Sequence, residues 1–214
     1  MSKSNYLEDF AVGQKIVHAI PRTISEGDAS LYIALTGDRR PLFCSETFAS
    51  HLGYKEIPVH DMLVFHIAFG RTVQDISLNA IANLGYADVR FTSPVFLGDT
   101  LRSESTVIGI KENSNKKNGI VYVYSRVYNQ HNEQVLSWQR WVMLPKKNNE
   151  ALVPTTHIPE IKDHVDPKNI SIPSYLNARN FDIASTGSDR LWGDYLVGQT
   201  IDHSHGLTVD ETAH

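Results

Sequence analysis

The chain has 214 residues, of which 41% are hydrophobic, and its formal net charge is −4. This length suffices for one hydrophobic core, or for one core and part of another. A weakly acidic chain has no electrostatic reason to bind nucleic acid or a membrane surface. Cys44 is the single cysteine, so no internal disulfide can form, and residues 1–10 are too polar for a signal peptide. We therefore expect a cytoplasmic protein with no nucleic-acid or membrane partner.

The first part of the chain predicts one strand and two short helices. Residues 15–24 form the strand pattern. Ser25 or Asp28 is expected to cap a helix that ends at Gly37, because small oxygen-bearing side chains are favoured before a helix and glycine just after one. Ser45 then begins a second short helix.

Residues 62–76 predict the central helix of the fold. The first half, Met-Leu-Val-Phe-His-Ile-Ala-Phe-Gly, is apolar nearly all round, which is typical of a helix buried on most sides. Asp61 is well placed at its start, where the helix dipole favours a carboxylate. His66 lies in the apolar half and is expected to be a core histidine.

Only strand patterns follow this helix. They occupy residues 81–91, 100–110, 121–128 and 135–144, with turn residues between them. Long strands of period two joined by tight turns indicate an antiparallel sheet. One buried helix followed by such a sheet predicts an α+β protein of the hot-dog kind, in which the sheet wraps the helix.

The last part of the chain repeats the beginning. Residues 147–190 are polar and interrupted by prolines, which predicts a linker. Beyond it, Asp-Tyr-Leu-Val-Gly-Gln-Thr-Ile at 194–201 matches Asp-Phe-Ala-Val-Gly-Gln-Lys-Ile at 9–16. We therefore expect residues 1–146 to form the first domain and 191–214 to be the truncated start of a second, too short to bury a core alone.

Short motifs carry a resemblance to a known family. Gly-Asp-Arg-Arg-Pro-Leu-Phe at 37–43, Pro-Val-His-Asp-Met-Leu at 58–63 and Arg-Phe-Thr-Ser-Pro-Val at 90–95 resemble three motifs of the MaoC-like dehydratases. These read Gly-Asp-x-Asn-Pro-Leu-His, Pro-Ile-x-His-Gly-Met-Leu and Arg-Phe-x-x-Pro-Val. The segments 63–66 and 76–80 are similar to those of two-domain mesaconyl-CoA hydratases, also called β-methylmalyl-CoA dehydratases.

The resemblance implies a hot-dog lyase that hydrates an enoyl thioester, with coenzyme A as part of the substrate and no separate cofactor. In the family, the Asp and His of the first motif hold and activate the water, and backbone N–H groups at the start of the central helix stabilise the enolate. Asp38 matches that Asp, but Arg40 replaces the Asn, Phe43 replaces the His, and Asp61 replaces a glycine of the second motif.

These replacements predict that the first domain is catalytically degenerate. Phenylalanine cannot carry a proton, and a carboxylate near the thioester would repel the developing enolate. The working motif is then expected in the second domain, and the catalytic residues of this chain are unknown. We expect the 214-residue chain to be inactive by itself, and Phe43→His with Asp61→Gly to be the smallest change with any chance of gain.

Several residues are candidates for substrate contacts by their place in the resembling motifs: His60, Asp61, Met62, Asn83, Gly85 and Arg90. His60 could equally be a loop histidine with a satisfied hydrogen bond, and Asp38 is expected to pair with Arg39 or Arg40. No metal site is expected from the histidines near the end of the chain, His203, His205 and His214.

Three functions stay open. The leading one is a hydro-lyase acting on a short branched or dicarboxylic enoyl-CoA such as mesaconyl-CoA. The second is a non-catalytic acyl-CoA-binding module, and the third is a thioesterase in which Asp61 activates water at the carbonyl. The remnant Asp38-x-x-Pro41-Leu42 favours descent from a hydratase. Because a single hot-dog domain leaves a sheet edge unpaired, we also expect a homodimer.

Overall fold

The computed structural model describes residues 5–153, 156–170, 172–203 and 206–212. The chain divides into two compact units. The first consists of Met1–Ile24 with Asp61–Ser171, and the second of Ser25–His60 with Ile172–His214.

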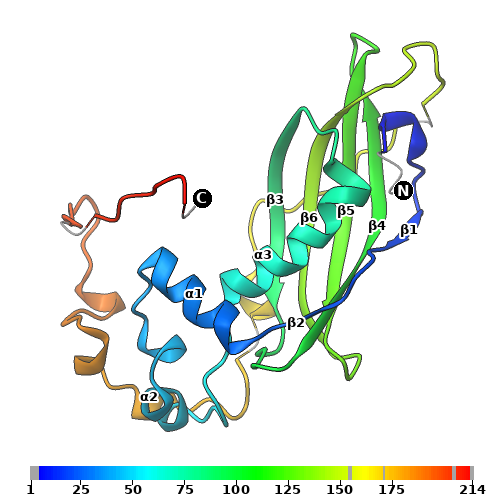
Figure 1. Ribbon diagram of the computed structural model, residues 1–214. Helices are drawn as coiled ribbons and strands as arrows, with labels where there is room; N and C mark the ends of the chain where they lie inside the picture. Colours follow the sequence, from blue (N-terminus) through cyan, green and yellow to red (C-terminus); the bar gives the residue numbers. More distant parts are fainter. Residues whose placement is uncertain (1–4, 154–155, 171, 204–205, 213–214) are drawn as a thin grey trace. The chain divides into compact units, whose positions relative to one another are not determined.

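The first unit is an antiparallel sheet with one long helix across it (Figure 1). The strand order is β1-β4-β5-β6-β3, and β2 pairs with β4 at one end. This arrangement confirms the predicted α+β hot-dog fold. Its elements are β1 (Lys15–Val17), β2 (Arg22–Thr23), α3 (Asp61–Thr72) with a π-helical turn at Val73–Ser77, β3 (Ala82–Phe91), β4 (Thr100–Glu112), β5 (Asn118–Tyr128) and β6 (Gln134–Pro145).

The core of this unit lies between the sheet and the segments packed on its inner face. Period-two alternation turns every second residue of β4, β5 and β6 inward. Fully burying one such aliphatic side chain stabilises the fold by about 1.5–3 kcal/mol. One cluster of the core consists of Leu7, Phe10, Ile76, Val107, Ile110, Val121, Val123, Val142 and Leu144.

Helix α3 exposes one narrow stripe in the described structure. Leu63, Val64 and Ala68 are buried, whereas Met62 is 41% exposed and His66 is also exposed. Phe65, Ile67 and Phe69 are half-buried, so the helix is buried or half-buried on most sides as expected, but His66 is exposed and is not a core histidine. The exposed stripe consists of Met62, His66 and Gly70, which are spaced four residues apart on one side of the helix.

The predicted first strand is divided in two. β1 pairs with β4 up to Val17, and β2 pairs with β4 again from Arg22. Between them Ile20 adopts a positive φ of 66°. This left-handed conformation interrupts the extended strand, and it is rare for a β-branched residue. Hydrophobic alternation alone does not reveal such a break.

The second unit contains the two short helices, α1 (Glu26–Thr36) and α2 (Glu46–His51). The Ser25 side chain accepts a hydrogen bond from the Asp28 backbone N–H, and the Asp28 carboxylate accepts one from the Ser25 backbone N–H. Gly37 ends α1 in the left-handed conformation, with φ of 65°. Ser45 caps α2 by accepting from the backbone N–H of Phe48. These caps are confirmed where the sequence predicts them.

The two segments that repeat in the sequence form the same local turn. Asp9 and Asp194 each accept a hydrogen bond from the backbone N–H three residues earlier, at 2.9 and 2.7 Å. Gln14 and Gln199 each accept one from the N–H three residues earlier, at 3.1 and 3.2 Å. The glycine before each glutamine has a positive φ, 86° and 83°. In the second segment no strand follows this turn within residues 200–203 and 206–212.

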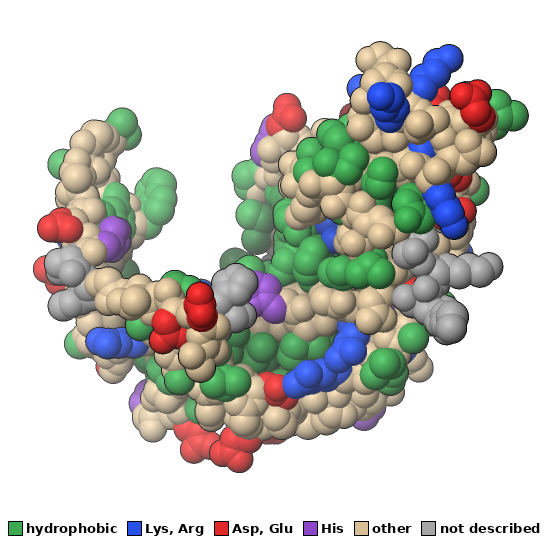
Figure 2. Space-filling model, turned by 45° about the horizontal axis from the view of Figure 1, so that its top comes forward, with side chains coloured by type: hydrophobic (Ala, Val, Ile, Leu, Met, Phe, Trp, Pro, Cys, Tyr) green, Lys and Arg blue, Asp and Glu red, His purple; other side chains and the backbone are tan. Residues whose placement is uncertain are grey.

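Hydrophobic side chains also remain on the surface, where Figure 2 shows them in green. Some of them belong to β3, which is an edge strand of the sheet: Leu84, Tyr86, Val89 and Phe91. None of the helices in the described ranges is long and apolar enough to cross a membrane.

Gly85 is required by packing within the sheet, which gives a test of the fold. A Cβ at this position would lie 2.5 Å from Cζ2 of Trp141, whereas a Cβ at Gly70 on α3 would meet nothing within 4 Å. Gly85→Ala should lower the free energy of unfolding by about 1–3 kcal/mol. Gly70→Ala should leave it unchanged or raise it by about 0.5–1 kcal/mol, because alanine favours a helix. Urea denaturation measures both, and equal effects would contradict this packing.

Candidate functional site

The second unit brings Asp38, Arg40 and His60 into direct contact. Asp38 follows the left-handed Gly37 that ends α1, and Arg40 precedes the 3₁₀ turn Pro41–Phe43. The Asp38 carboxylate accepts hydrogen bonds from Arg40 Nε, at 3.1 and 3.0 Å, and from Nη2, at 2.7 Å. His60 Nε2 lies 2.6 Å from Asp38 Oδ2 and also contacts Arg40 Nη2. The carboxylate is therefore held between a guanidinium and an imidazole.

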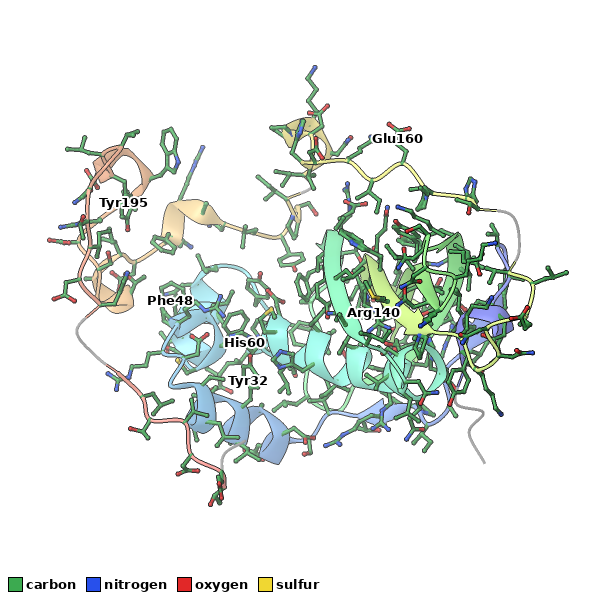
Figure 3. The ribbon with its side chains drawn as sticks, turned by 90° about the horizontal axis from the view of Figure 1, so that it is seen from above. Tyr32, Phe48, His60, Arg140, Glu160 and Tyr195 are labelled. Carbon is green, nitrogen blue, oxygen red and sulfur yellow. The ribbon has the colours of Figure 1, made fainter. Side chains whose placement is uncertain are left out.

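Two aromatic rings pack around the imidazole of His60. Tyr32 of α1 has its ring centroid 4.8 Å from that of His60, and the Phe43 ring is 4.6 Å away (Figure 3 labels Tyr32 and His60). The guanidinium of Arg40 covers the Phe43 ring at 4.9 Å. His60 is 5% exposed, so it is a buried histidine with a satisfied hydrogen bond. A pocket contact with substrate remains a prediction.

The charge pattern of this cluster keeps Asp38 ionised. Hydrogen bonds from Arg40 hold the pKa of the Asp38 carboxyl far below its usual range, with a smaller contribution from His60. Burial, with the nearby Asp38 charge second, raises the pKa of the Tyr32 hydroxyl. A general base needs a pKa near the working pH, so a carboxylate held in this way is a poor proton acceptor.

The geometry answers one of the questions left open by the sequence. Asp38 pairs with Arg40, which stands where the resembling motif has asparagine. His60 contacts Asp38, and the Phe43 ring packs on the imidazole of His60. Sequence spacing did not predict this contact, because Asp38 and His60 are 22 residues apart and meet only through the fold.

The other candidate residues belong to the first unit. Asp61 is the first residue of α3 and places its carboxylate in the first turn, as predicted. Met62 is partly exposed beside it. Asn83 donates a hydrogen bond to the hydroxyl of Tyr86 at 2.6 Å, and Gly85 is covered by the Trp141 ring. Their roles in substrate binding remain predictions.

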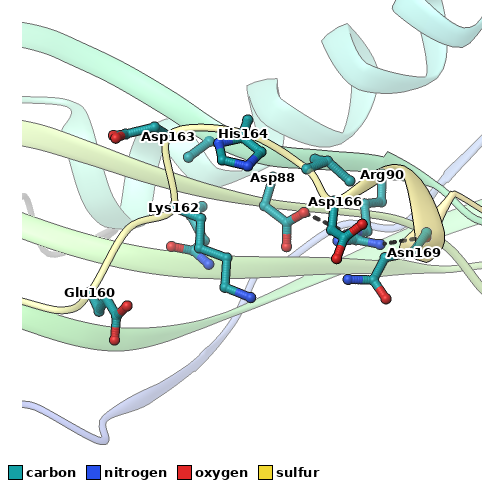
Figure 4. Close-up of a pocket in the computed structure, with 11 residues that line it drawn as sticks. Asp88, Arg90, Glu160, Lys162, Asp163, His164, Asp166 and Asn169 are labelled. Atoms are coloured by element: carbon teal, nitrogen blue, oxygen red, sulfur yellow. Dashed lines mark hydrogen bonds and ion pairs between the residues drawn. The ribbon is translucent and has the colours of Figure 1, made fainter.

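Arg90 lines a polar pocket on the outer face of the sheet. Its Nε donates to Asp88 at 2.6 Å and its Nη1 donates to the backbone carbonyl of Asn169 at 3.2 Å (Figure 4). The pocket has a volume of about 250 Å³. Acidic and basic side chains line it together: Asp88, Arg90, Glu160, Lys162, Asp163, His164 and Asp166. The guanidinium of Arg90 is therefore already neutralised within the first unit.

A buried polar network under α3 was not predicted from the sequence. His18 Nδ1 lies 2.8 Å from Asp75 Oδ2, and its Nε2 lies 2.8 Å from Ser105 Oγ, which in turn contacts Ser125 Oγ at 2.7 Å. On the same inner face of the sheet Arg140 is 1% exposed. The burial of Arg140 could have been predicted from the sequence, because Arg140 alternates in step with the inward residues Trp138 and Val142 of β6.

Possible metal ligands are not grouped in the described part of the chain. No three His, Cys, Asp or Glu side chains lie close enough there to hold an ion. Of the histidines near the chain end, His205 and His214 lie outside the described residues.

The Arg40 contact should control the ionisation of Asp38. Arg40→Ala removes the main cause of the low pKa, so the pKa of the Asp38 carboxyl should rise toward its ordinary value. Arg39→Ala, a neighbouring exposed arginine, should leave it unchanged. Because the folded-state pKa of Asp38 is depressed, its contribution to stability is present above the unfolded pKa and is lost as the pH falls through the folded one. Arg40→Ala should therefore shift the onset of acid unfolding to higher pH.

Carbon-13 NMR titration of the Asp38 carboxyl carbon measures this pKa in the wild type and in both variants. An unchanged Asp38 titration in Arg40→Ala would contradict the assigned contact.

Comparison with known proteins places the chain in a family. The MaoC like domain model matches residues 9–129. β-Methylmalyl-CoA dehydratase of Chloroflexus aurantiacus is 50% identical over 98% of this chain and 60% of its own length. Mesaconyl-CoA hydratase of Cereibacter sphaeroides is 48% identical over 98% of this chain and 61% of its own.

Solved structures agree with this placement. A MaoC domain protein of Chloroflexus aurantiacus matches with a TM-score of 0.94 and 48% identity, over 100% of this chain and 61% of that one. A double-hotdog protein of Mycobacterium tuberculosis matches with a TM-score of 0.61 at 21% identity, which shows the fold alone. The chain spans about three fifths of the length of the two curated relatives. The extent of the family match and of the identity leads to one conclusion: this chain belongs to the MaoC-like domain family.

Proposed function

We propose that this chain acts in the reversible hydration of a short enoyl-CoA such as mesaconyl-CoA, as the catalytically degenerate first half of a two-domain hydratase. Membership of the MaoC-like family supports the reaction class. Two relatives that match nearly the whole chain are named as a mesaconyl-CoA hydratase and a β-methylmalyl-CoA dehydratase, which supports the substrate. Coenzyme A enters as part of the substrate, and the proposal includes no further cofactor.

The observation that carries the degenerate role is the Asp38–Arg40 ion pair. Hydration needs a group that accepts a proton from water while a second group orients it. In this chain the carboxylate of that pair is saturated by a guanidinium, and Phe43 occupies the motif position of the second group. This pairing supports a first domain that does not carry out the proton transfer.

The repeated turn supports the two-domain organisation, with a first domain over residues 1–146, a linker over 147–190 and the start of a second domain at 191. Both copies of the turn have the same hydrogen bonds. Leu7 and Phe10 of the first copy are 0% and 1% exposed, whereas the corresponding Trp192 and Tyr195 are 93% and 51% exposed. The side chains that anchor the first copy to a core are thus at the surface in the second.

The free edge of β3 supports association. This strand ends the sheet and carries exposed apolar side chains, and unpaired strand edges favour pairing with another chain. We infer that two copies of this chain form a homodimer along β3. Multi-angle light scattering at micromolar concentration should give twice the chain mass of 24.0 kDa, and a monomer would contradict this. A cytoplasmic location remains a prediction.

The catalytic role is tested with purified protein and mesaconyl-CoA. Losing a positioned acid or base costs about 10²- to 10⁴-fold in rate, and losing an oxyanion donor costs roughly 10²- to 10³-fold. The chain should bind mesaconyl-CoA in calorimetry but hydrate it far below the ordinary range of about 1 to 10³ per second. Ordinary turnover would contradict the degenerate role, and release of free CoA from a saturated acyl-CoA would favour a thioesterase.

Restoring the family residues gives a sharper test. Because Arg40 neutralises Asp38, Phe43→His and Asp61→Gly should not suffice without Arg40→Asn. The triple variant should gain at least about 10²-fold in hydration rate over the wild-type chain. The same variant with Asp38→Asn is the matched control and should lose that gain. An equal gain in the triple variant and in its Asp38→Asn control would show that Asp38 is not the group that Arg40→Asn makes available for catalysis.

A further inference from the structure

Arg140 is a charged residue in the middle of the inner face of the sheet. It lies on β6 and is paired across the strands with Tyr86 of β3 and Val123 of β5. The side chain is 1% exposed, although the neighbouring inward positions of β6 hold the apolar residues Trp138 and Val142. Figure 3 labels Arg140 within the sheet. A charged residue in such a position is expensive to bury and calls for a partner.

The guanidinium of Arg140 forms no ion pair and no hydrogen bond of ordinary geometry in the described part of the chain, and the neutral hydroxyl of Tyr86 is the oxygen that acts on it. Its Nε, Nη1 and Nη2 are all buried without a hydrogen-bond partner there, and so is Nε1 of Trp138. Both side chains are on the same face of β6, because residues two apart in a strand point to the same side. The inner face thus presents several N–H donors and no carboxylate that pairs with the guanidinium among the described residues.

Nearby acceptors within the first unit are already used. The carboxylate of Asp75 is engaged by His18, and the hydroxyls of Ser105 and Ser125 are engaged by His18 and by each other. The positive charge of Arg140 even acts on His18, where it lowers the pKa of the imidazole in addition to the larger effect of burial.

Aromatic side chains of α3 and the sheet enclose the guanidinium. The Arg140 Cζ lies 4.7 Å from the Phe69 ring centroid, and the Phe69 ring is 5.7 Å from Phe65 and 6.0 Å from Tyr86. Trp138 packs on Phe65 at 5.3 Å. A positive charge between rings, away from water, attracts an anion more strongly than it would at the surface. Burial lowers the pKa of Arg140 to about 10, so the group remains charged at neutral pH.

We propose that Arg140 binds the free carboxylate of a dicarboxylic acyl thioester, and so selects dicarboxylic over monocarboxylic substrates. This inference rests on the proposed function, because mesaconyl-CoA carries such a second carboxylate. The planar guanidinium matches a carboxylate with two parallel hydrogen bonds, and the surrounding rings suit a short methyl-branched chain. The bound carboxylate neutralises the buried charge.

Other arginines of the first unit do not fit this role. Arg90 in the outer pocket already has Asp88 as its partner. Gln139, next to Arg140 on β6, lines that same pocket, and adjacent residues of a strand point to opposite faces of the sheet. For a carboxylate to reach Arg140, the rings of Tyr86 and Phe69 must move aside. Tyr86 is 39% exposed, so displacement of its ring uncovers the guanidinium of Arg140.

Two saturated thioesters of the same shape test the proposal without any turnover. Methylsuccinyl-CoA carries the free carboxylate, and 2-methylbutyryl-CoA has a methyl group in its place. Isothermal titration calorimetry of the 214-residue chain should give a dissociation constant about 10²- to 10³-fold lower for methylsuccinyl-CoA. Equal affinities would overturn the role of Arg140 and leave CoA-thioester binding intact. Binding of neither would instead overturn the proposed function for this chain.

Variants at Arg140 separate ligand binding from a structural role. Arg140→Met should abolish the preference for methylsuccinyl-CoA and leave binding of 2-methylbutyryl-CoA unchanged. Arg102→Met is the matched control, because Arg102 donates to Asn132 at 2.9 Å on the outer side of β4, and it should retain the preference.

The thermal midpoint gives a second readout. Because a buried arginine without an ion-pair partner destabilises the ligand-free chain, Arg140→Met should melt at the same or a higher temperature than the wild type. A clearly lower midpoint together with a retained ligand preference would show a structural role and overturn the proposal.

Discussion

The packing of α3 on the concave face of the sheet is the interaction on which the rest of the first unit depends. Leu63, Val64 and Ala68 cover the inward residues of the strands and exclude water from them. Every polar group trapped beneath the helix must then find its partner inside the protein, because water cannot supply one. His18, Ser105 and Ser125 meet this requirement through hydrogen bonds with one another and with Asp75.

The same requirement makes Arg140 informative. Its guanidinium lies in the same apolar interior but forms no ion pair there among the described residues, and only the neutral hydroxyl of Tyr86 acts on it. A protein that needed only stability would gain from an apolar residue at this place, since replacing buried charges by well-packed hydrophobic residues is often stabilising. Groups retained at a cost to stability are typical of functional sites. The opposite holds in the second unit, where Asp38 is fully engaged by Arg40 and His60.

These two sites suggest a division of roles. In the proposed account, the charge of Arg40 beside Asp38 suppresses proton transfer at the family motif. The inner face of the sheet keeps an unsatisfied charge that can recognise a substrate. A first domain that binds and a second domain that reacts would account for both features, and for the length of the relatives that match this chain.

Much of the fold could be predicted from the sequence, because local signals determine it. Ser25, Gly37 and Ser45 act as caps through contacts within a few residues, and the alternation along β4 to β6 follows directly from strand geometry. What depends on the fold could not be predicted. The exposure of His66 depends on how much of α3 the sheet covers, and the partner of Asp38 is 22 residues away.

Arg140 could be predicted from the sequence only in part. Its phase along the strand placed it on the inner face, but the lack of an ion-pair partner is visible only when the neighbouring strands and α3 are in place. In the same way, the sequence suggested a repeat at residue 191, whereas the shared hydrogen bonds of the two turns are visible only in the three-dimensional structure.

The central claim is that this chain recognises its substrate and does not carry out the chemistry. A crystal structure of the chain with methylsuccinyl-CoA bound tests it most directly. The account predicts the free carboxylate within hydrogen-bonding distance of the Arg140 guanidinium, with Tyr86 displaced and Asp38 still paired with Arg40. A carboxylate bound elsewhere, with Arg40 moved away from Asp38 and the acyl carbons against Asp38 and His60, would contradict it.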